Sequence, residues 1–325
     1  MIKYSFIIPV KEINDYVREA VPNVLNISRD DYEILIYPDE TNGETWPKTK
    51  QIATGHCGPA TKRTKAIGDA SGEILIFIDD DAYPEKNFID MLERDFVDPK
   101  VLAVGGPAIT PADDSFWQKV SGAVYLSVLS GGYPERYAPI GDRRTVDDWP
   151  SVNFSMRKEI FSELGGFASE FWPGEDTKLC LDLVKKYPGS IIYDPKLIVY
   201  HHRRSGLLRH LKQVGGYGLH RGFFAKKYPE TSFRLKYFIP SAFLSFVIIG
   251  GIWSLFSKTA ATIYLIGWVL YGMALIKAFY DIFRHEKNIL IAFNAIYAIF
   301  LTHIVYGYKF IKGFVFTKKL ISKLR

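Results

Sequence analysis

The chain has 325 residues, of which 48% are hydrophobic and 23% are charged, and its formal net charge is +6. This length accommodates one α/β domain and an additional part. The two cysteines, Cys57 and Cys180, lack the paired spacing of zinc ligands and are too few for a disulfide framework. The composition therefore excludes a disulfide-rich domain and a zinc site built on cysteine.

The first hundred residues alternate short apolar runs with helix-compatible segments. The apolar runs are predicted strands, at residues 4–10, 32–38, 73–78 and 101–108. The segments between them are predicted to contain helices, over about 15–25 and 58–72. Strands separated by helices indicate a parallel sheet with helices on both faces. We therefore expect a Rossmann-like α/β fold with a mostly parallel sheet.

Polar groups follow three of these predicted strands. In a parallel sheet, ligands bind beyond the carboxyl ends of the strands. The segments at those ends are Pro9–Glu12, Asp39-Glu40 and Asp79-Asp80-Asp81. Three adjacent aspartates are often a solvated turn, but their position after a buried strand favours a metal site. Asp79 and Asp81 can direct oxygens to one point, and Mg²⁺ and Mn²⁺ prefer oxygen ligands.

Three more features could contribute to a site. Glu175-Asp176 begins a predicted helix, where a carboxylate is either a cap or a general base; taken alone, the cap is favoured. His201-His202 follows a predicted strand and could complete a metal shell or belong to a basic interfacial cluster. Arg63 precedes the aspartate strand, and its spacing does not distinguish a phosphate contact from a solvated helix face.

A basic segment separates this domain, residues 1–205, from the rest of the chain. Between Arg203 and Lys227 there are seven Lys and Arg residues and no acid, interleaved with leucine and phenylalanine. This pattern predicts an amphipathic helix on a membrane surface within a connector over residues 206–235. The positive charge suits anionic lipids better than nucleic acid.

Three apolar stretches follow the connector, within residues 236–311. Residues 237–256 and 259–276 carry no charge, and residues 288–308 carry only a histidine. A bilayer core of about 30 Å needs roughly 20 apolar residues, so an integral membrane protein is predicted. The N-terminus lacks signal-peptide features, and we expect the first 235 residues to be cytoplasmic.

The number of membrane crossings stays open between two and three. Three crossings would place the basic tail, residues 312–325, on the far side from the first domain. Positive charge favours the cytoplasm, so an even number of crossings fits better. The third stretch, which contains Asn294 and His303, could then lie at the membrane surface or pack against a partner.

Six sequence blocks resemble those of family 2 glycosyltransferases of the GT-A fold, over about residues 3–230. In chain order the blocks are FIIPVKE, EILIYPDE, GPATKRTKAIGDASGEILIFIDDDAYPE, VNFSMRKEIFSELGGF, PGEDTKLCLDL and IIYDPKLIVYHHRR. The basic segment followed by apolar stretches is similar to exopolysaccharide-type members, such as succinoglycan-biosynthesis enzymes. Polyprenyl-phosphate sugar synthases are a looser match.

The resemblance implies a role for each matching residue. The family's DXD motif falls on Asp79 and Asp81, which would hold Mg²⁺ or Mn²⁺ and the donor diphosphate, with Asp80 at the nucleoside or the turn. The strand-end histidine falls on His201 or His202, of which we favour His202 as a metal ligand. The ED motif falls on Glu175-Asp176, with Asp176 as catalytic base. The remaining donor-binding positions are Pro9, Glu12, Asp39 and Arg63.

The family reaction is the transfer of a sugar from a UDP- or GDP-sugar to a lipid-linked or polysaccharide acceptor. The expected mechanism is a single inverting displacement, with the base opposite the leaving group. The chain lacks a QxxRW motif, which argues against a processive synthase, and its second strand ends in YPDE instead of the usual acidic-acidic-glycine-serine run. The alternatives are a synthase that glycosylates the lipid phosphate itself, and a non-catalytic nucleotide-binding membrane adaptor.

Overall fold

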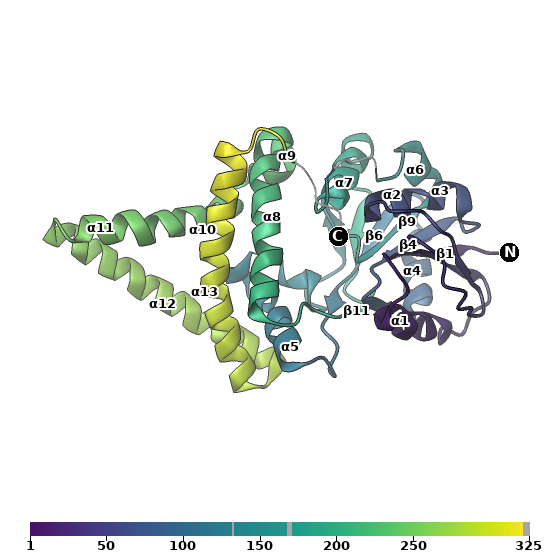
Figure 1. Ribbon diagram of the computed structural model, residues 1–325, viewed down its shortest axis with the longest axis horizontal. Helices are drawn as coiled ribbons and strands as arrows, with labels where there is room; N and C mark the ends of the chain where they lie inside the picture. The colour runs from purple at the N-terminus through teal and green to yellow at the C-terminus, as the bar shows by residue number, and fades with distance from the viewer. Residues whose placement is uncertain (132, 168–170, 321–325) are drawn as a thin grey trace. The chain divides into compact units, whose positions relative to one another are not determined.

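The computed structural model describes residues 1–131, 133–167 and 171–320 (Figure 1). The chain divides into two compact units. Residues 1–111 and 138–202 form the first unit, and residues 112–137 and 203–320 form the second. The segment 112–137 therefore joins the apolar C-terminal part, which the pattern of the sequence alone did not indicate.

An eight-stranded sheet forms the centre of the first unit. Its strands, in spatial order, are β3 (Thr49–Gln51), β2 (Tyr32–Tyr37), β1 (Tyr4–Pro9), β4 (Ile74–Ile78), β9 (Asn153–Arg157), β6 (Ala103–Gly105), β10 (Ile191–Tyr193) and β8 (Arg144–Val146). Four neighbouring pairs are parallel, namely β3–β2, β2–β1, β1–β4 and β6–β10. Strand β9 is antiparallel to both β4 and β6, and β8 is antiparallel to β10. The predicted parallel strands are confirmed, within a sheet that is mixed.

A second, three-stranded sheet lies at the carboxyl end of β4. Its order is β5 (Ala82–Pro84), β11 (Val199–His201) and β7 (Ala108–Ile109). The run predicted as one strand over 101–108 is thus divided between the two sheets. It breaks at Gly106, where a Cβ atom would lie 1.8 Å from the carbonyl oxygen of Leu197, and at Pro107, which has no N–H to donate.

Helices cover both faces of the large sheet, as predicted. On one face lie α1 (Asp15–Leu25) and α4 (Phe88–Phe96). On the other lie α2 (Pro59–Thr64), α3 (Ala66–Asp69), α6 (Lys158–Glu163) and α7 (Glu175–Lys186) (Figure 1). Each face has its own apolar core, because every side chain of β1 and β4 is buried. These cores hold the strand ends in fixed positions.

The second unit is helical. Its α-helices are α5 (Phe116–Ala123), α8 (Leu207–Lys227), α9 (Pro229–Ser232), α10 (Leu235–Ser245), α11 (Gly251–Ser254), α12 (Lys258–Glu286) and α13 (Ile289–Ile311). The 3₁₀ turns are η1 (Val124–Leu126), η2 (Val128–Ser130) and η3 (Pro134–Arg136). The π-helical segments are η4 (Phe246–Gly250), between α10 and α11, and η5 (Lys312–Phe316), after α13.

Three helical segments of the second unit are long and apolar enough to cross a membrane. They are Leu235–Ser254, Lys258–Glu286 and Ile289–Phe316. The structure describes all three completely. None of the most apolar 18-residue window is buried in the protein in the first two, whereas 39% of that window is buried in the third. The three predicted hydrophobic helices are confirmed, and they differ in their surroundings.

Candidate active site

Three potential metal ligands converge where β4 and β11 end. Oxygen atoms of Asp79 and Asp81 and a ring nitrogen of His201 all lie within 4.8 Å of one another. Nε2 of His201 is 3.2 Å from Oδ1 of Asp81, whose residue is 5% exposed. The antiparallel register of β11 with β5 places His201 opposite Ala82. A strand far along the chain thus brings the histidine beside the aspartates.

His202 lies outside this group, in contrast to our expectation that it is the metal ligand. Its Nε2 is 3.1 Å from Oε2 of Glu19, and its ring lies 5.0 Å from that of Tyr16. Its backbone N–H donates to the carbonyl oxygen of Asp81 at 2.9 Å. Successive side chains of an extended chain point to opposite faces, so only one of two adjacent histidines can point toward the aspartates. In this structure it is His201.

The chemistry of the three side chains fits a divalent cation. Two carboxylates supply hard oxygen ligands, which Mg²⁺ and Mn²⁺ both accept. The imidazole nitrogen of His201 adds a ligand that suits transition metals better than Mg²⁺. The group Asp79, Asp81 and His201 can therefore hold a divalent metal ion.

Arg63 connects this group to the start of α7. The arginine is 3% exposed, on the inner face of α2. One terminal nitrogen donates to Asp79 at 2.5 Å, and the other donates to Oε1 of Glu175 at 3.1 Å. The solvated-face alternative for Arg63 is therefore wrong, and this cation lies between two carboxylates.

The two acids that begin α7 differ in environment. Glu175 is 4% exposed, and its Oε2 accepts a hydrogen bond from the Gly174 N–H at 3.0 Å. Burial and the neighbouring Asp176 raise the pKa of Glu175 to about 7, against the opposing effect of Arg63. Asp176 is half-buried, and its Oδ1 accepts from the Thr177 N–H at 2.7 Å. Glu175 is thus the inner acid of the pair, and Asp176 is the more accessible one.

The ends of β1 and β2 are joined by Lys62. This buried lysine donates to a carboxylate oxygen of Asp39 and, at 2.6 Å, to the carbonyl oxygen of Val10. The contact with Lys62 holds the pKa of Asp39 below its usual range. Pro9 is the buried last residue of β1, whereas Glu12 is exposed. Of the predicted donor-binding residues, Pro9 and Asp39 therefore lie at adjacent strand ends.

Asp80 is held by a residue that the sequence patterns did not single out. Nδ2 of Asn14 donates to Oδ2 of Asp80 at 2.8 Å, and Oδ1 of the same asparagine accepts from the Val17 N–H at 3.0 Å. Asn14 is therefore the N-cap of α1, which fixes the direction of its amide group. An asparagine just before a predicted helix is a capping signal, and this signal could have identified it.

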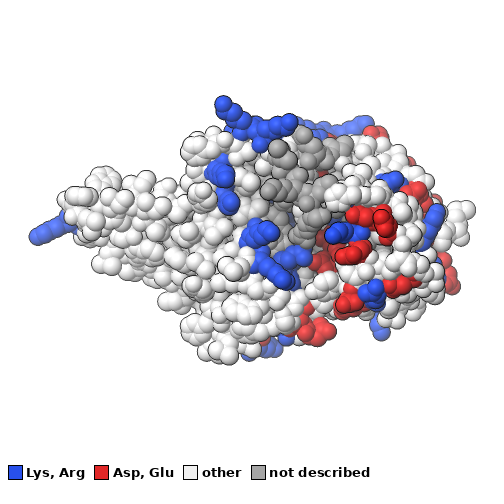
Figure 2. All heavy atoms as spheres, in the orientation of Figure 1, with Lys and Arg blue, Asp and Glu red and all other residues white. Residues whose placement is uncertain are grey.

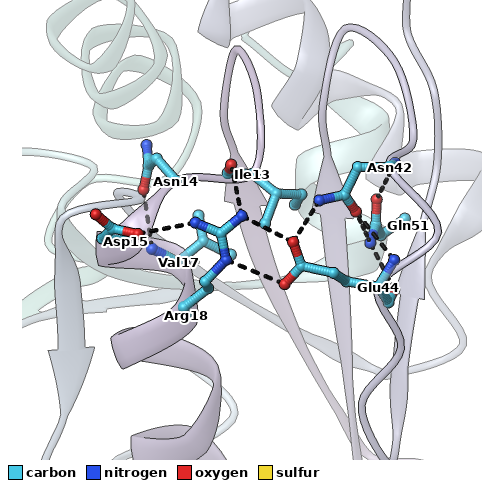
Figure 3. Close-up of polar contacts among 8 residues, drawn as sticks. All are labelled: Ile13, Asn14, Asp15, Val17, Arg18, Asn42, Glu44 and Gln51. Atoms are coloured by element: carbon cyan, nitrogen blue, oxygen red, sulfur yellow. Dashed lines mark hydrogen bonds and ion pairs between the residues drawn. The ribbon is translucent and has the colours of Figure 1, made fainter.

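A polar network fastens the loop after β2 to the start of α1 (Figure 3). Arg18 donates to Oδ1 of Asp15 at 2.8 Å and to both oxygens of Glu44 at 2.8 and 3.1 Å. Asn42 donates to Glu44 at 2.6 Å, and Gln51 donates to the Asn42 side chain at 3.0 Å. The loop that begins at Asp39 is thereby restrained beside the strand ends.

Known proteins resemble this chain in sequence and in fold. Residues 5–165 match the family model described as "Glycosyl transferase family 2". A "Dolichyl N-acetyl-alpha-D-glucosaminyl phosphate 3-beta-D-2,3-diacetamido-2,3-dideoxy-beta-D-glucuronosyltransferase" from Methanococcus voltae is 26% identical over 332 residues, 96% of this chain and 97% of the relative. "Pre-mycofactocin glycosyltransferase" from Mycobacterium tuberculosis is 25% identical over 175 residues, 54% of this chain but 36% of the relative.

A solved structure agrees in fold. Mannosyltransferase PcManGT from Pyrobaculum calidifontis, in complex with GDP-Man and Mn²⁺, gives a TM-score of 0.57 at 17% identity, over 98% of this chain and 88% of that chain. This likeness shows the fold, and the family model and the curated relatives show the enzyme class. The chain belongs to the family 2 glycosyltransferases and has their GT-A fold.

Proposed function

We propose that this enzyme transfers a sugar from a nucleotide-sugar donor to a lipid-linked acceptor at a membrane. The observation that carries the proposal is the connection of the Asp79–Asp81–His201 group, through Arg63, to Glu175. It joins a site for the donor diphosphate to an acid pair within one unit of the protein. The M. voltae relative, named for transfer to a dolichyl-phosphate-linked sugar, aligns over the apolar helices as well, which supports a lipid-linked acceptor.

The donor end of the proposed site is built from the strand ends. When bound, Mn²⁺ or Mg²⁺ at Asp79, Asp81 and His201 would supply positive charge to the departing diphosphate. Asp39, restrained by Lys62, would accept hydrogen bonds from the nucleoside of the donor. Asp80, held by Asn14, would support the turn from which its two neighbours point to the metal group.

Asp176 is the proposed general base. Its carboxylate is half-buried at the first turn of α7, and an acceptor can approach it. Glu175 occupies the inner position, where it pairs with Arg63 and is not available to take a proton from an acceptor. In an inverting transfer, Asp176 would receive the acceptor hydroxyl proton as the oxygen attacks the anomeric carbon and the nucleoside diphosphate leaves.

The acceptor of the proposed reaction is a sugar already attached to a lipid phosphate. The M. voltae relative is named for such an acceptor, which favours this reaction over glycosylation of the lipid phosphate itself. The absence of a QxxRW motif supports a single transfer without processive extension. We propose that the first unit, with both substrates, acts on the cytoplasmic side of the membrane.

A donor screen with the purified full-length protein tests this function. UDP- and GDP-sugars are supplied with Mn²⁺ and lipid extract, and release of nucleoside diphosphate is measured. Release should be abolished in Asp81→Ala and Asp176→Asn. It should persist in Asp182→Asn, a control on α7 whose carboxylate pairs with Lys178. Release at the wild-type rate by Asp176→Asn, or no release with any donor, would contradict the proposal.

A further inference from the structure

The three apolar helical segments of the second unit have different surroundings. Residues 237–256 of the first segment and 259–276 of the second form an arm with two limbs. The first limb consists of α10, η4 and α11, and the second limb is the part of α12 that runs back from the tip. Its two limbs leave one side of the α8–α13 pair and converge at a tip (Figure 1). Most large apolar side chains of the arm are exposed, among them Ile252, Trp253 and Leu270. At its base the arm packs against α13, where the ring centres of Phe238 and Phe310 lie 4.8 Å apart. Beyond this contact it presents apolar surface that no other described part of its own unit covers.

Helix α13 is instead packed against α8 through glycines. A Cβ atom at Gly218 would lie 2.8 Å from the carbonyl oxygen of Tyr306, and one at Gly222 would lie 2.2 Å from that of Phe310. At the end of the same interface, a Cβ at Gly313 would lie 2.1 Å from the carbonyl oxygen of Leu219. Backbones this close can only be accommodated by glycine. The two helices run side by side in the same direction (Figure 1).

Buried hydrogen bonds add to this packing. His210 of α8 makes contacts of 2.9 Å with Oγ of Ser121 in α5 and 3.1 Å with Oγ1 of Thr302 in α13. The histidine is 1% exposed. The first half of α13 packs with α5 and the last turns of α12 in one apolar cluster, which includes Ile291 and Ile299. These contacts bury 39% of the most apolar window of the third segment, whereas none of that window is buried in the first two.

The charges of α8 determine where this pair of helices can lie. Arg209 and Lys212 lie toward one end of α8, and Arg221, Lys226 and Lys227 lie toward the other. The uncharged interval, residues 213–220, spans only about 12 Å at 1.5 Å per residue. A bilayer core is about 30 Å thick, and an Arg or Lys near its centre costs about 2.5–3.5 kcal/mol. Because α8 cannot cross a bilayer at this cost, α13 cannot cross while it is packed along α8.

The arm matches a bilayer in length and in charge. Its limbs of 20 and 18 uncharged residues extend about 30 and 27 Å. Lys236 marks the base of the first limb, with its Nζ 3.7 Å from the ring centre of Tyr133, and Lys277 marks the base of the second. Lysine and tyrosine are typical of the membrane–water interface. On the face drawn in Figure 2 the arm is white along its length and blue at the tip, where the limbs join at Ser257-Lys258.

We infer that the arm alone crosses the bilayer, twice, and that α8 and α13 lie outside the hydrocarbon core on the side of the first unit. The lysines after α13, Lys318 and Lys319, are then on the same side as the first unit. This arrangement satisfies the preference of positive charge for the cytoplasm, which three crossings would violate. The inference rests on the packing of the second unit and is independent of the proposed activity.

Cysteine labelling of the full-length protein in cells tests the inference. In a Cys57→Ser background, single cysteines replace the exposed Lys100 of the first unit, Lys258 at the tip, His285 before α13, and Lys318 after it. The buried Cys180 is retained. A membrane-impermeant maleimide is applied to intact and to permeabilised cells. Variants are compared with wild type by gel filtration in detergent, and Lys319→Cys replaces Lys318→Cys if the latter does not elute as wild type.

The expected result is that Lys318→Cys behaves like Lys100→Cys and His285→Cys, and opposite to Lys258→Cys. With a cytoplasmic first unit, only the Lys258 position is labelled in intact cells. Labelling of positions 258 and 318 from the same side would show three crossings and overturn the inference. Labelling of positions 258 and 100 from the same side would show that the arm does not cross, which overturns it as well.

Discussion

Arg63 donates a hydrogen bond of 3.1 Å to Glu175, a residue 112 positions later in the chain. The same guanidinium donates to Asp79 at 2.5 Å, and both Arg63 and Glu175 are almost completely buried. One planar cation thus sets the distance between the aspartates after β4 and the acids that begin α7. A guanidinium suits this role because its nitrogens diverge in a fixed plane.

Replacing Arg63 with lysine should weaken metal binding at the aspartates. Lysine keeps the charge but cannot donate to two separated carboxylates in a fixed geometry. Loss of an outer contact to a metal ligand typically lowers metal affinity by about 10- to 100-fold. Titration of the purified protein with Mn²⁺, followed by electron paramagnetic resonance, measures this affinity without relying on turnover.

Lys65 provides the control, because it is the exposed C-cap residue of the helix that carries Arg63. Lys65→Gln removes a positive charge at nearly the same position along the chain and should leave Mn²⁺ affinity unchanged. Equal affinities in Arg63→Lys and in the wild type would show that Arg63 does not position Asp79.

The raised pKa of Glu175, about 7, should give opposite trends in activity and stability. Below this pH the folded protein carries a proton on Glu175, which weakens the pair with Arg63, so donor turnover should fall as the pH drops through about 7. In the folded state the pKa lies above the ordinary value of 4.5, so the folded state binds this proton more tightly than the unfolded state. The contribution of Glu175 to stability is therefore greatest below pH 4.5 and declines as the pH rises to about 7, by about 3 kcal/mol at most.

Glu175→Gln separates this effect from other titrations. Thermal unfolding in detergent, measured between pH 5 and about 8, should vary less with pH in the variant than in the wild type. If the two proteins show the same pH dependence of unfolding, Glu175 does not titrate in this range.

Much of the fold could be predicted from the sequence because its signals are local. The runs that became β1, β2 and β4 are largely apolar, and an acid follows within three residues of the end of each strand, so the edge of the sheet that carries the candidate site was predictable. The insertion of β9 between β4 and β6 was not, since antiparallel pairing over such a distance leaves no local pattern. The mixed character of the sheet therefore emerges only in three dimensions.

The candidate site shows the same division. Asp79, Asp81 and Glu175-Asp176 were identifiable from residue type and position at strand and helix ends. The choice between His201 and His202 depends on the register of β11 with β5. Because the two histidines are adjacent and identical, the sequence does not indicate which of them faces the aspartates. The position of Arg63 between two acids likewise depends on how α2 packs, and residue spacing in the sequence does not indicate that packing.

The two histidines make a matched pair of substitutions for the metal site. His201→Ala removes a ring nitrogen from the group with Asp79 and Asp81 and should lower Mn²⁺ affinity by more than the roughly 10- to 100-fold of a lost outer contact. His202→Ala removes a contact to Glu19 and should leave Mn²⁺ affinity close to wild type. A larger loss in His202→Ala than in His201→Ala, in the same titration, would restore His202 as the ligand.

The glycines of α8 allow a test of its packing on α13. Gly222→Ala places a methyl group 2.2 Å from the Phe310 carbonyl oxygen, so the helices must separate, and overpacking of this kind costs about 1–3 kcal/mol. At Gly216, in the same helix, a Cβ would meet nothing within 4 Å. Gly216→Ala should instead stabilise α8 by about 0.5–1 kcal/mol, because alanine loses less conformational freedom than glycine. Thermal unfolding in detergent should therefore shift downward for Gly222→Ala and slightly upward for Gly216→Ala, and equal shifts would mean that α8 is not packed against α13 in the membrane-extracted protein.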